Sequence, residues 1–315
     1  MEENLTAVTG FIFLGFSGLQ HLQPLLFVLI LLIYLFTLIG NGLIITIVYV
    51  DLRLHTPMYF FLCNLSLLEI LFVLSITPKM LENLLSQAKV ISFWGCITQC
   101  YFYFFLGTAD FILLAIMSFD RYVAICHPLH YPVIMSGHVC VFLVMGCWLV
   151  GFLSTLYPLI LLCQLPFCGP NVINHFFCDY APLVRLSCVD THFLLMIEYV
   201  LSSVVLLTSL SFTAVPYLYI IATVLHIPLA TGRRKAFSTC TSHITVASIY
   251  YISAIFMYAR PIQSRSLDLQ KVVVVFNIIV SPLLNPFIYT LRNKKVKEAL
   301  KEYLTRKSSV LQPEP

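Results

Sequence analysis

The sequence predicts an all-α membrane protein, a seven-transmembrane helix bundle with a short amphipathic C-terminal helix. Apolar residues make up 60% of the 315 residues and charged residues only 10%, whereas soluble domains average about 45–50% and about 25%. Seven apolar stretches reach the roughly 20 residues that a helix needs to cross a bilayer. A soluble core could not hide this much apolar surface, so we expect lipid around the chain.

The seven spans are expected to be helices because lipid offers no hydrogen bonds to an open backbone. Strands of a β-barrel would be about half as long and would alternate in polarity, which these stretches do not. The spans run over 25–50, 58–79, 94–119, 139–163, 193–225, 236–259 and 272–291.

We divide the chain into a tail over 1–24, a bundle over 25–291 and a second tail over 292–315. Because residues 1–24 contain no Lys or Arg, no cleavable signal peptide is expected. In the second tail Val296, Leu300 and Leu304 are spaced by four among basic residues. This spacing predicts an amphipathic helix along the inner leaflet, where it would contact membrane lipid.

The distribution of basic residues orients the bundle. With residues 1–24 outside, twelve Lys and Arg lie in inner segments and six in outer segments. The positive-inside rule therefore predicts an N-terminus outside the membrane, and we expect that membrane to be the plasma membrane. The sequon at Asn4 is then a candidate glycosylation site. Four cysteines also fall on the outer side, where an oxidising compartment permits disulfides, and their spacing leaves three pairings open. They are Cys96, Cys168, Cys178 and Cys188.

Some spans contain isolated ionisable residues, which are functional candidates in a membrane. Glu69 and Asp110 lie near mid-span, where they could share a proton or hold a sodium ion, or each could be satisfied separately. Glu198 is the only charged residue of its span. For His243, a hydrogen-bonding role inside the bundle is favoured over a metal site.

Two motifs lie at the inner ends of spans. Asp120-Arg121-Tyr122 ends the third span, where an acid–base pair can anchor topology or can hold the bundle shut until a ligand shifts the balance. Asn285-Pro286, with Tyr289, lies near the end of the seventh. Pro286 should kink the helix, either as a static bend or at a point that moves.

These motifs, with Gly40-Asn41 and Trp148, resemble the rhodopsin-like G-protein-coupled receptors. A finer similarity, to vertebrate odorant receptors, comes from longer motifs that occur in the right order over nearly the whole chain. They are Pro57-Met58-Tyr59-Phe60-Phe61-Leu62, Met117–Cys126, Lys235–His243 and Pro282–Tyr289, with Phe11, Leu14, Gly15 and Phe16 near the start.

The resemblance implies two disulfides, Cys96–Cys178 and Cys168–Cys188. It also implies that Glu69 and Asp110 are neighbours in a sodium-type pocket, although the family more usually has Asp at position 69. An allosteric sodium ion is the only cofactor it suggests. Tyr217, Arg121 and Tyr289 would change contacts when the inner half of the sixth span moves outward.

The resemblance further implies a ligand pocket in the outer half of the bundle. The third-span residues recur at three- and four-residue spacing and share one aromatic, weakly polar and uncharged face, which suits a small, mostly apolar volatile with one polar group. The pocket residues lie on the third, fifth and sixth spans. They are Cys100, Tyr103, Phe104, Gly107, Thr108, Ser202, Val205, Tyr251, Ala254, Ile255 and Tyr258.

The implied function is that of an odorant receptor in the cilia of olfactory neurons, which activates a stimulatory heterotrimeric G protein and raises cAMP. A transporter or channel is the alternative, but it would need a polar route, and three spans have no Asp, Glu, Lys, Arg or His. An enzyme is disfavoured because HExxH and GxSxG signatures are absent. The net charge of +4 is too modest to indicate nucleic-acid binding.

Overall fold

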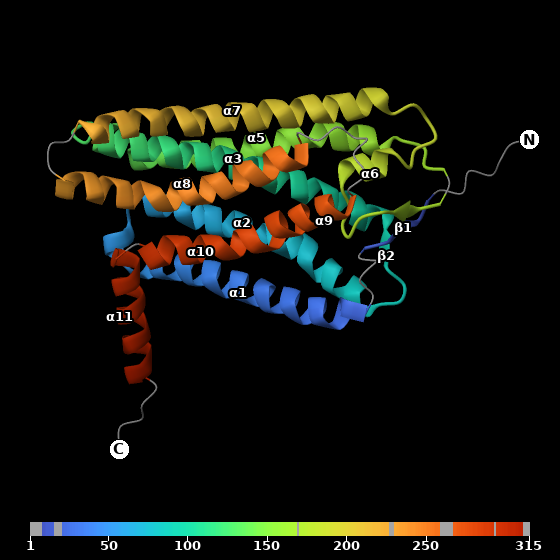
Figure 1. Ribbon diagram of the computed structural model, residues 1–315, viewed down its shortest axis with the longest axis horizontal. Helices are drawn as coiled ribbons and strands as arrows, with labels where there is room; N and C mark the ends of the chain where they lie inside the picture. Colours follow the sequence, from blue (N-terminus) through green and yellow to red (C-terminus); the bar gives the residue numbers. More distant parts are fainter. Residues whose placement is uncertain are drawn as a thin grey trace, which may run out of the picture.

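The computed structural model describes residues 8–15, 21–168, 170–226, 230–258, 267–292 and 294–310. Within these residues, seven helices are long and apolar enough to cross a membrane, and they lie side by side in one bundle (Figure 1). The predicted fold class is therefore confirmed. Six of these helices are α1 Gln23–Val50, α2 Pro57–Leu85, α3 Phe93–Cys126, α5 Gly137–Cys163, α7 His192–Leu225 and α8 Ala230–Tyr258.

The seventh crossing is divided into α9 Leu267–Val275, the π-helical turn η3 Phe276–Val280 and α10 Ser281–Arg292. Pro282 has no N–H for the carbonyl four residues earlier, and the N–H of Ser281 donates to Phe276, five residues earlier. The sequence predicted a kink at Pro286, and the wide turn lies before it. Shorter helices are η2 Leu52–Leu54, α4 Tyr131–Ile134, α6 Tyr180–Val184 and α11 Lys294–Val310.

Two helices extend beyond the spans that hydropathy predicts. α2 continues past Lys79, whose Nζ lies 2.7 Å from Glu82 one turn later. α3 continues past 119 to Cys126 and so includes Asp120-Arg121-Tyr122. Charged residues end an apolar stretch without ending a helix, because the backbone bonds do not depend on side-chain polarity.

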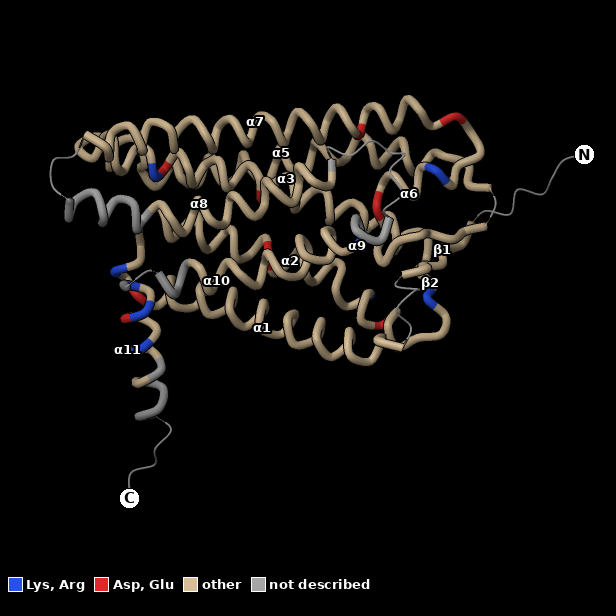
Figure 2. Tube along the Cα trace, in the orientation of Figure 1, with Lys and Arg blue, Asp and Glu red and all other residues tan. Residues whose placement is uncertain are grey.

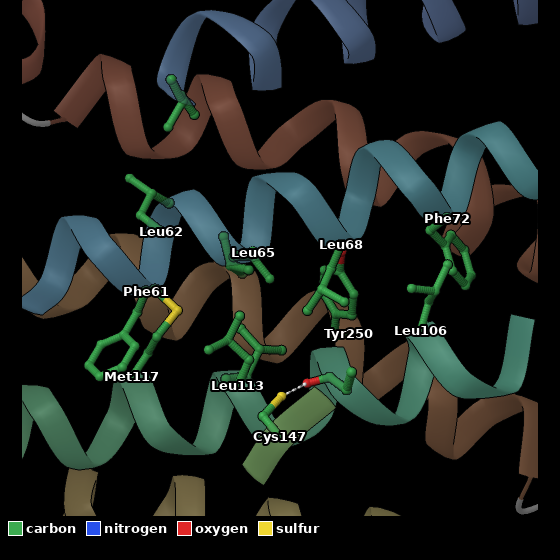
Figure 3. Packing of buried hydrophobic residues seen from close by; sticks show 14 of the residues in the cluster. Phe61, Leu62, Leu65, Leu68, Phe72, Leu106, Leu113, Met117, Cys147 and Tyr250 are labelled. Carbon is green, nitrogen blue, oxygen red and sulfur yellow. Dashed lines mark hydrogen bonds between the residues drawn. The ribbon is translucent and has the colours of Figure 1, made fainter. Parts of the chain in front are cut away.

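The core lies around α3, which contacts α2, α5 and α7. Leu65 and Leu68 of α2 face Leu106 and Leu113 of α3 in a layer of buried side chains (Figure 3). The helices also approach closely at small residues. A Cβ on Gly151 would lie 2.9 Å from the carbonyl oxygen of Phe105, so this residue lets α5 contact α3 directly.

The N-terminal segment forms a strand, which the sequence analysis did not predict. β1 Gly10–Phe13 pairs antiparallel with β2 Val90–Ser92 and parallel with β3 Val172–Ile173. Phe11 and Phe13 are buried and Ile12 is 45% exposed, which is the alternation of a half-buried strand. This outer sheet lies at the end of the bundle opposite α11 (Figure 1).

Further links fix the outer sheet to the bundle. Lys271 of α9 donates through Nζ to the backbone oxygen of Gly15 at 3.0 Å and to Oδ1 of Asn174 at 2.8 Å. The disulfide Cys96–Cys178 joins α3 to the loop before α6, with Cα atoms 5.4 Å apart. Cys168–Cys188 closes that loop, at 5.3 Å. Both disulfide pairings are those that the family resemblance implied.

The C-terminal helix α11 turns away from the bundle axis, and Lys and Arg gather at this end of the molecule (Figure 2). Val296 is buried and Leu300 packs against the main core, so one face of α11 is apolar as predicted. Arg53 connects η2 to this helix through Glu302, with nitrogen and oxygen 2.9 Å apart. The side chain of Leu304 lies outside the described residues.

We expect Phe11→Ala to loosen the outer sheet by about 3 kcal/mol, the low end for a buried Phe, because β1 can open without unfolding the bundle. Hydrogen exchange of the β1 amides should then be about a hundredfold faster. Ile12→Ala, at the exposed neighbour, is the control. Equal exchange in the two variants would contradict this assignment of β1.

Candidate functional site

Two adjacent cavities lie between α3 and α7 in the outer half of the bundle. The α5-side cavity, about 70 Å³, is closed by α5 and α6, and the α8-side cavity, about 60 Å³, by α2, α8 and η3. They share Phe104, Thr108, Ser202 and Val205. A larger groove of about 740 Å³ lies between α2 and α3 near Trp94 and contains none of the predicted ligand residues.

Most of the predicted ligand residues meet at these cavities. Cys100 lines the α5-side cavity, Tyr103 and Gly107 line the α8-side cavity, and the four shared residues line both. The spacing along α3 explains this, because positions three and four apart share one helix face.

The structure places none of the predicted ligand residues of α8 whose side chains it describes at these cavities. Tyr251 is buried and its hydroxyl lies 2.9 Å from Thr213 Oγ1, and Ala254 packs in the same small cluster between α7 and α8. Ile255 is 42% exposed and lines neither cavity. Among the described residues of α8, Met257 lines the α8-side cavity, and these three residues lie outside both cavities. The side chain of Tyr258 lies outside the described residues.

The sequence analysis missed several cavity residues. Ser154 and Thr155 of α5 line the α5-side cavity together with Tyr180 of α6 and Glu198 of α7. Glu198 places a carboxyl in the cavity on α7, opposite the α3 face that was expected to be uncharged. The signal was present, because Glu198 is the only charged residue of its span, but the depth and facing of its side chain come only from the structure.

The loop before α6 adds two ionisable groups, the buried His175 and the partly buried Asp179. Asp179 caps α6 by accepting a hydrogen bond from the Tyr180 N–H, and burial raises its pKa to about 6. Burial and the nearby charge of Lys271 lower the pKa of His175 to about 3, so this imidazole is neutral at physiological pH. The His175 ring contacts Phe176 in a tilted arrangement and Phe177 edge to face, with ring centroids 4.5 and 4.6 Å away.

A polar cluster lies at mid-depth. Glu69 and Asp110 are 0% and 3% exposed. Glu69 Oε1 accepts from the Tyr250 hydroxyl at 3.1 Å and from Asn285 Nδ2, which joins α2, α8 and α10. Several buried oxygens have no hydrogen-bond partner among the described residues, and they include Oε2 of Glu69, Oδ1 of Asp110 and Oδ1 of Asn41. Such oxygens are the ligands that a hard cation prefers.

At the inner end, Asp120 and Arg121 form an ion pair, with Nε 2.9 Å from Oδ2. The second carboxylate oxygen of Asp120 accepts from the Tyr131 hydroxyl of α4 at 2.7 Å. Burial, together with the charge of Asp120, raises the pKa of Tyr131, so the phenol stays protonated and donates. The carboxylate is therefore held from two sides.

The other predicted inner residues lie around this pair. The Tyr217 hydroxyl and His243 Nδ1 are 2.5 Å apart and join α7 to α8, which is the hydrogen-bonding role favoured for His243. Tyr122 contacts His127 at 3.1 Å. Pro286 is in contact range of Gly40, since a Cβ there would lie 3.1 Å away. The side chain of Tyr289 lies outside the described residues, and so does Asn4.

The described residues contain no group of three or more His, Cys, Asp or Glu that could hold a metal ion. The cavities, the mid-depth cluster and the inner ion pair follow one another along α3. This arrangement suits a binding protein that changes shape.

Comparison with known proteins agrees with a binding protein. The olfactory receptor family model matches residues 30–307. Human olfactory receptor 6J1 is 52% identical over 97% of this chain and 88% of its own length. Human olfactory receptor 6T1 is 54% identical over 96% of this chain and 94% of its own length. Squid rhodopsin has the same fold at 18% identity, with a TM-score of 0.68 over 94% of this chain and 89% of that chain.

The family takes odorant ligands, signals through a G protein and consists of multi-pass plasma-membrane receptors, so an enzyme is excluded and a transporter or channel is not favoured. With about half of the residues shared along nearly the full length, the chain belongs to the olfactory receptor family of rhodopsin-like G-protein-coupled receptors.

Proposed function

We propose that this receptor binds a small volatile in the two cavities and activates a stimulatory heterotrimeric G protein, which raises cAMP. The observation that carries the proposal is that Phe104, Thr108, Ser202 and Val205 line two cavities that share one wall. A ligand there contacts α3 and α7 together and can favour one arrangement of these helices over another.

Activation is then a population shift in which the receptor does no chemistry. In the resting arrangement Asp120 forms an ion pair with Arg121, and Tyr217 forms a hydrogen bond with His243. We infer that ligand binding favours an arrangement in which the inner half of α8 moves outward and these contacts break. Arg121, Tyr217 and Tyr289 would then face the G protein, and Asp120, Tyr122, His243, Asn285 and Pro286 would set the balance.

The chain is proposed to lie in the ciliary membrane of olfactory neurons with its N-terminus outside. The two disulfides support this orientation, because they lie at the end opposite α11 and form in oxidising compartments. Asn4 would then be glycosylated, and the apolar face of α11 would contact lipid of the inner leaflet.

We further propose that Glu69 and Asp110 hold an allosteric sodium ion or share a proton. The unpartnered oxygens at mid-depth support either reading. A bound sodium ion would neutralise the negative charge of the Glu69 and Asp110 carboxylates between α2 and α3. If activation brought these carboxylates closer together, the site would have less room for the ion, and the bound ion would favour the resting arrangement.

The function is tested by measuring cAMP in cells that express the receptor during exposure to a panel of volatiles. At least one volatile should raise cAMP, and Arg121→Ala should reduce the response at least about tenfold, because Arg121 contacts the G protein only in the active arrangement. Surface labelling checks that the variant is expressed. A wild type that responds to no volatile, or an unchanged response in Arg121→Ala, would count against the proposal.

Loss of the Tyr131 hydroxyl should raise activity without ligand. Tyr131→Phe removes a hydrogen bond to a carboxylate, worth about 1.5–3 kcal/mol in general, so basal cAMP should rise several-fold. Tyr157→Phe, at a 58% exposed tyrosine of α5, is the control. Unchanged basal cAMP in Tyr131→Phe would show that its bond to Asp120 does not hold the resting state.

Replacing sodium chloride by choline chloride should change the potency of an active volatile on the wild type. Glu69→Gln and Asp110→Asn should remove that dependence, because each deletes a carboxylate that would bind the ion. Glu82→Gln removes an exposed carboxylate of the same α2 helix, 61% accessible, and should behave as wild type. Sodium dependence that persists in both buried variants would refute the site.

A further inference from the structure

Glu198 is the one Asp, Glu, Lys or Arg among the described residues that line the two cavities. It lies on α7 and faces the α5-side cavity together with Cys100 and Tyr180. A charged group within a membrane helix is costly and marks a functional site by default. Neither the mid-depth cluster nor the inner ion pair uses it.

No basic side chain among the described residues pairs with the Glu198 carboxyl. Its Oε1 accepts from the Ser202 hydroxyl at 3.1 Å, one turn further along α7. Within the described residues, the ion pairs involve other groups, and none joins Glu198 to Lys, Arg or His. A serine hydroxyl orients a carboxylate without cancelling its charge, so the cavity keeps an acceptor that favours a cation.

The surroundings add aromatic surface. The rings of Phe104 and Tyr180 meet edge to face, with centroids 6.4 Å apart, and both line the same cavity. Aromatic faces beside a carboxylate attract an organic cation, because the ring faces are negative and the apolar wall suits its carbon skeleton.

We propose that Glu198 binds the basic nitrogen of the ligand and that this receptor responds to small volatile amines. The inference rests on the proposed odorant-binding function and names the ligand class for the same cavities. The ammonium donates to the Glu198 carboxylate, with Ser202 holding Oε1, while the carbon skeleton lies against Phe104 and Val205. An acid of the same shape is repelled, and an alcohol leaves the carboxylate charge unpaired.

The test compares the amine, alcohol and carboxylic acid of three skeletons, cyclohexyl, benzyl and pentyl. The full-length receptor is assayed by cAMP in cells and by the melting temperature of purified protein in detergent. For at least one skeleton the amine should be at least about tenfold more potent than the alcohol, and the acid should be inactive. Glu198→Gln should remove this amine preference, with a loss of potency of about tenfold or more.

Two further variants distinguish the loss of the Glu198 charge from a disturbance of folding. Glu198→Asp keeps the charge and should retain part of the amine preference. Glu82→Gln makes the same chemical change at an exposed site on α2 and should leave the preference intact. Equal amine potency in wild type and Glu198→Gln would overturn the inference.

The outcomes also distinguish this inference from the proposed function. Alcohols or acids that raise cAMP while amines do not would support odorant signalling and overturn the amine assignment. Amines that raise the melting temperature of wild type, but not of Glu198→Gln, without raising cAMP would support the amine site and count against stimulatory coupling. No effect of any of the compounds on cAMP or melting temperature would overturn the inference.

Discussion

The absence of water in the hydrocarbon layer is the constraint on which the rest of this structure depends. It requires the backbone to form helices, and it also requires polar side chains to find partners inside the bundle. The three polar sites therefore lie where α3 contacts its neighbours. Glu198 and Ser202 line the α5-side cavity. Glu69 and Asn285 meet at mid-depth, and Asp120 and Arg121 pair at the inner end.

The sequence alone predicts the helices well because their signal is local and strong. Length and hydropathy find the seven crossings, and the positions of Cys96 and Cys178 allow the disulfide that the family resemblance then selects. Helix ends are predicted less well, as in α3, since Asp120 and Arg121 end the apolar stretch but remain helical. A rule based on side-chain polarity does not detect that the helical backbone continues past these charged residues.

Two features could not be predicted because they depend on distant partners. β1 is short, and its hydrogen bonds go to segments about 80 and 160 residues further along the chain. The role of Glu198 depends on the rotation of α7 about its axis, which packing against α3 decides. The same limit explains Ile255, which shares the sequence region of the predicted pocket but is 42% exposed.

The order of the sites along α3 suggests how ligand binding could reach the inner end. α3 contacts α7 extensively, and Ser118 donates to the backbone oxygen of Thr213 at 2.8 Å between the cavities and the inner ion pair. A ligand that moves α7 at Ser202 therefore acts on a helix that also carries Tyr217, the partner of His243. Because Thr213 also contacts Tyr251 of α8, this short stretch joins α3, α7 and α8. In the proposed activation the coupling needs no separate pathway, since the single helix α7 carries both the cavity wall and the Tyr217 contact that is proposed to break.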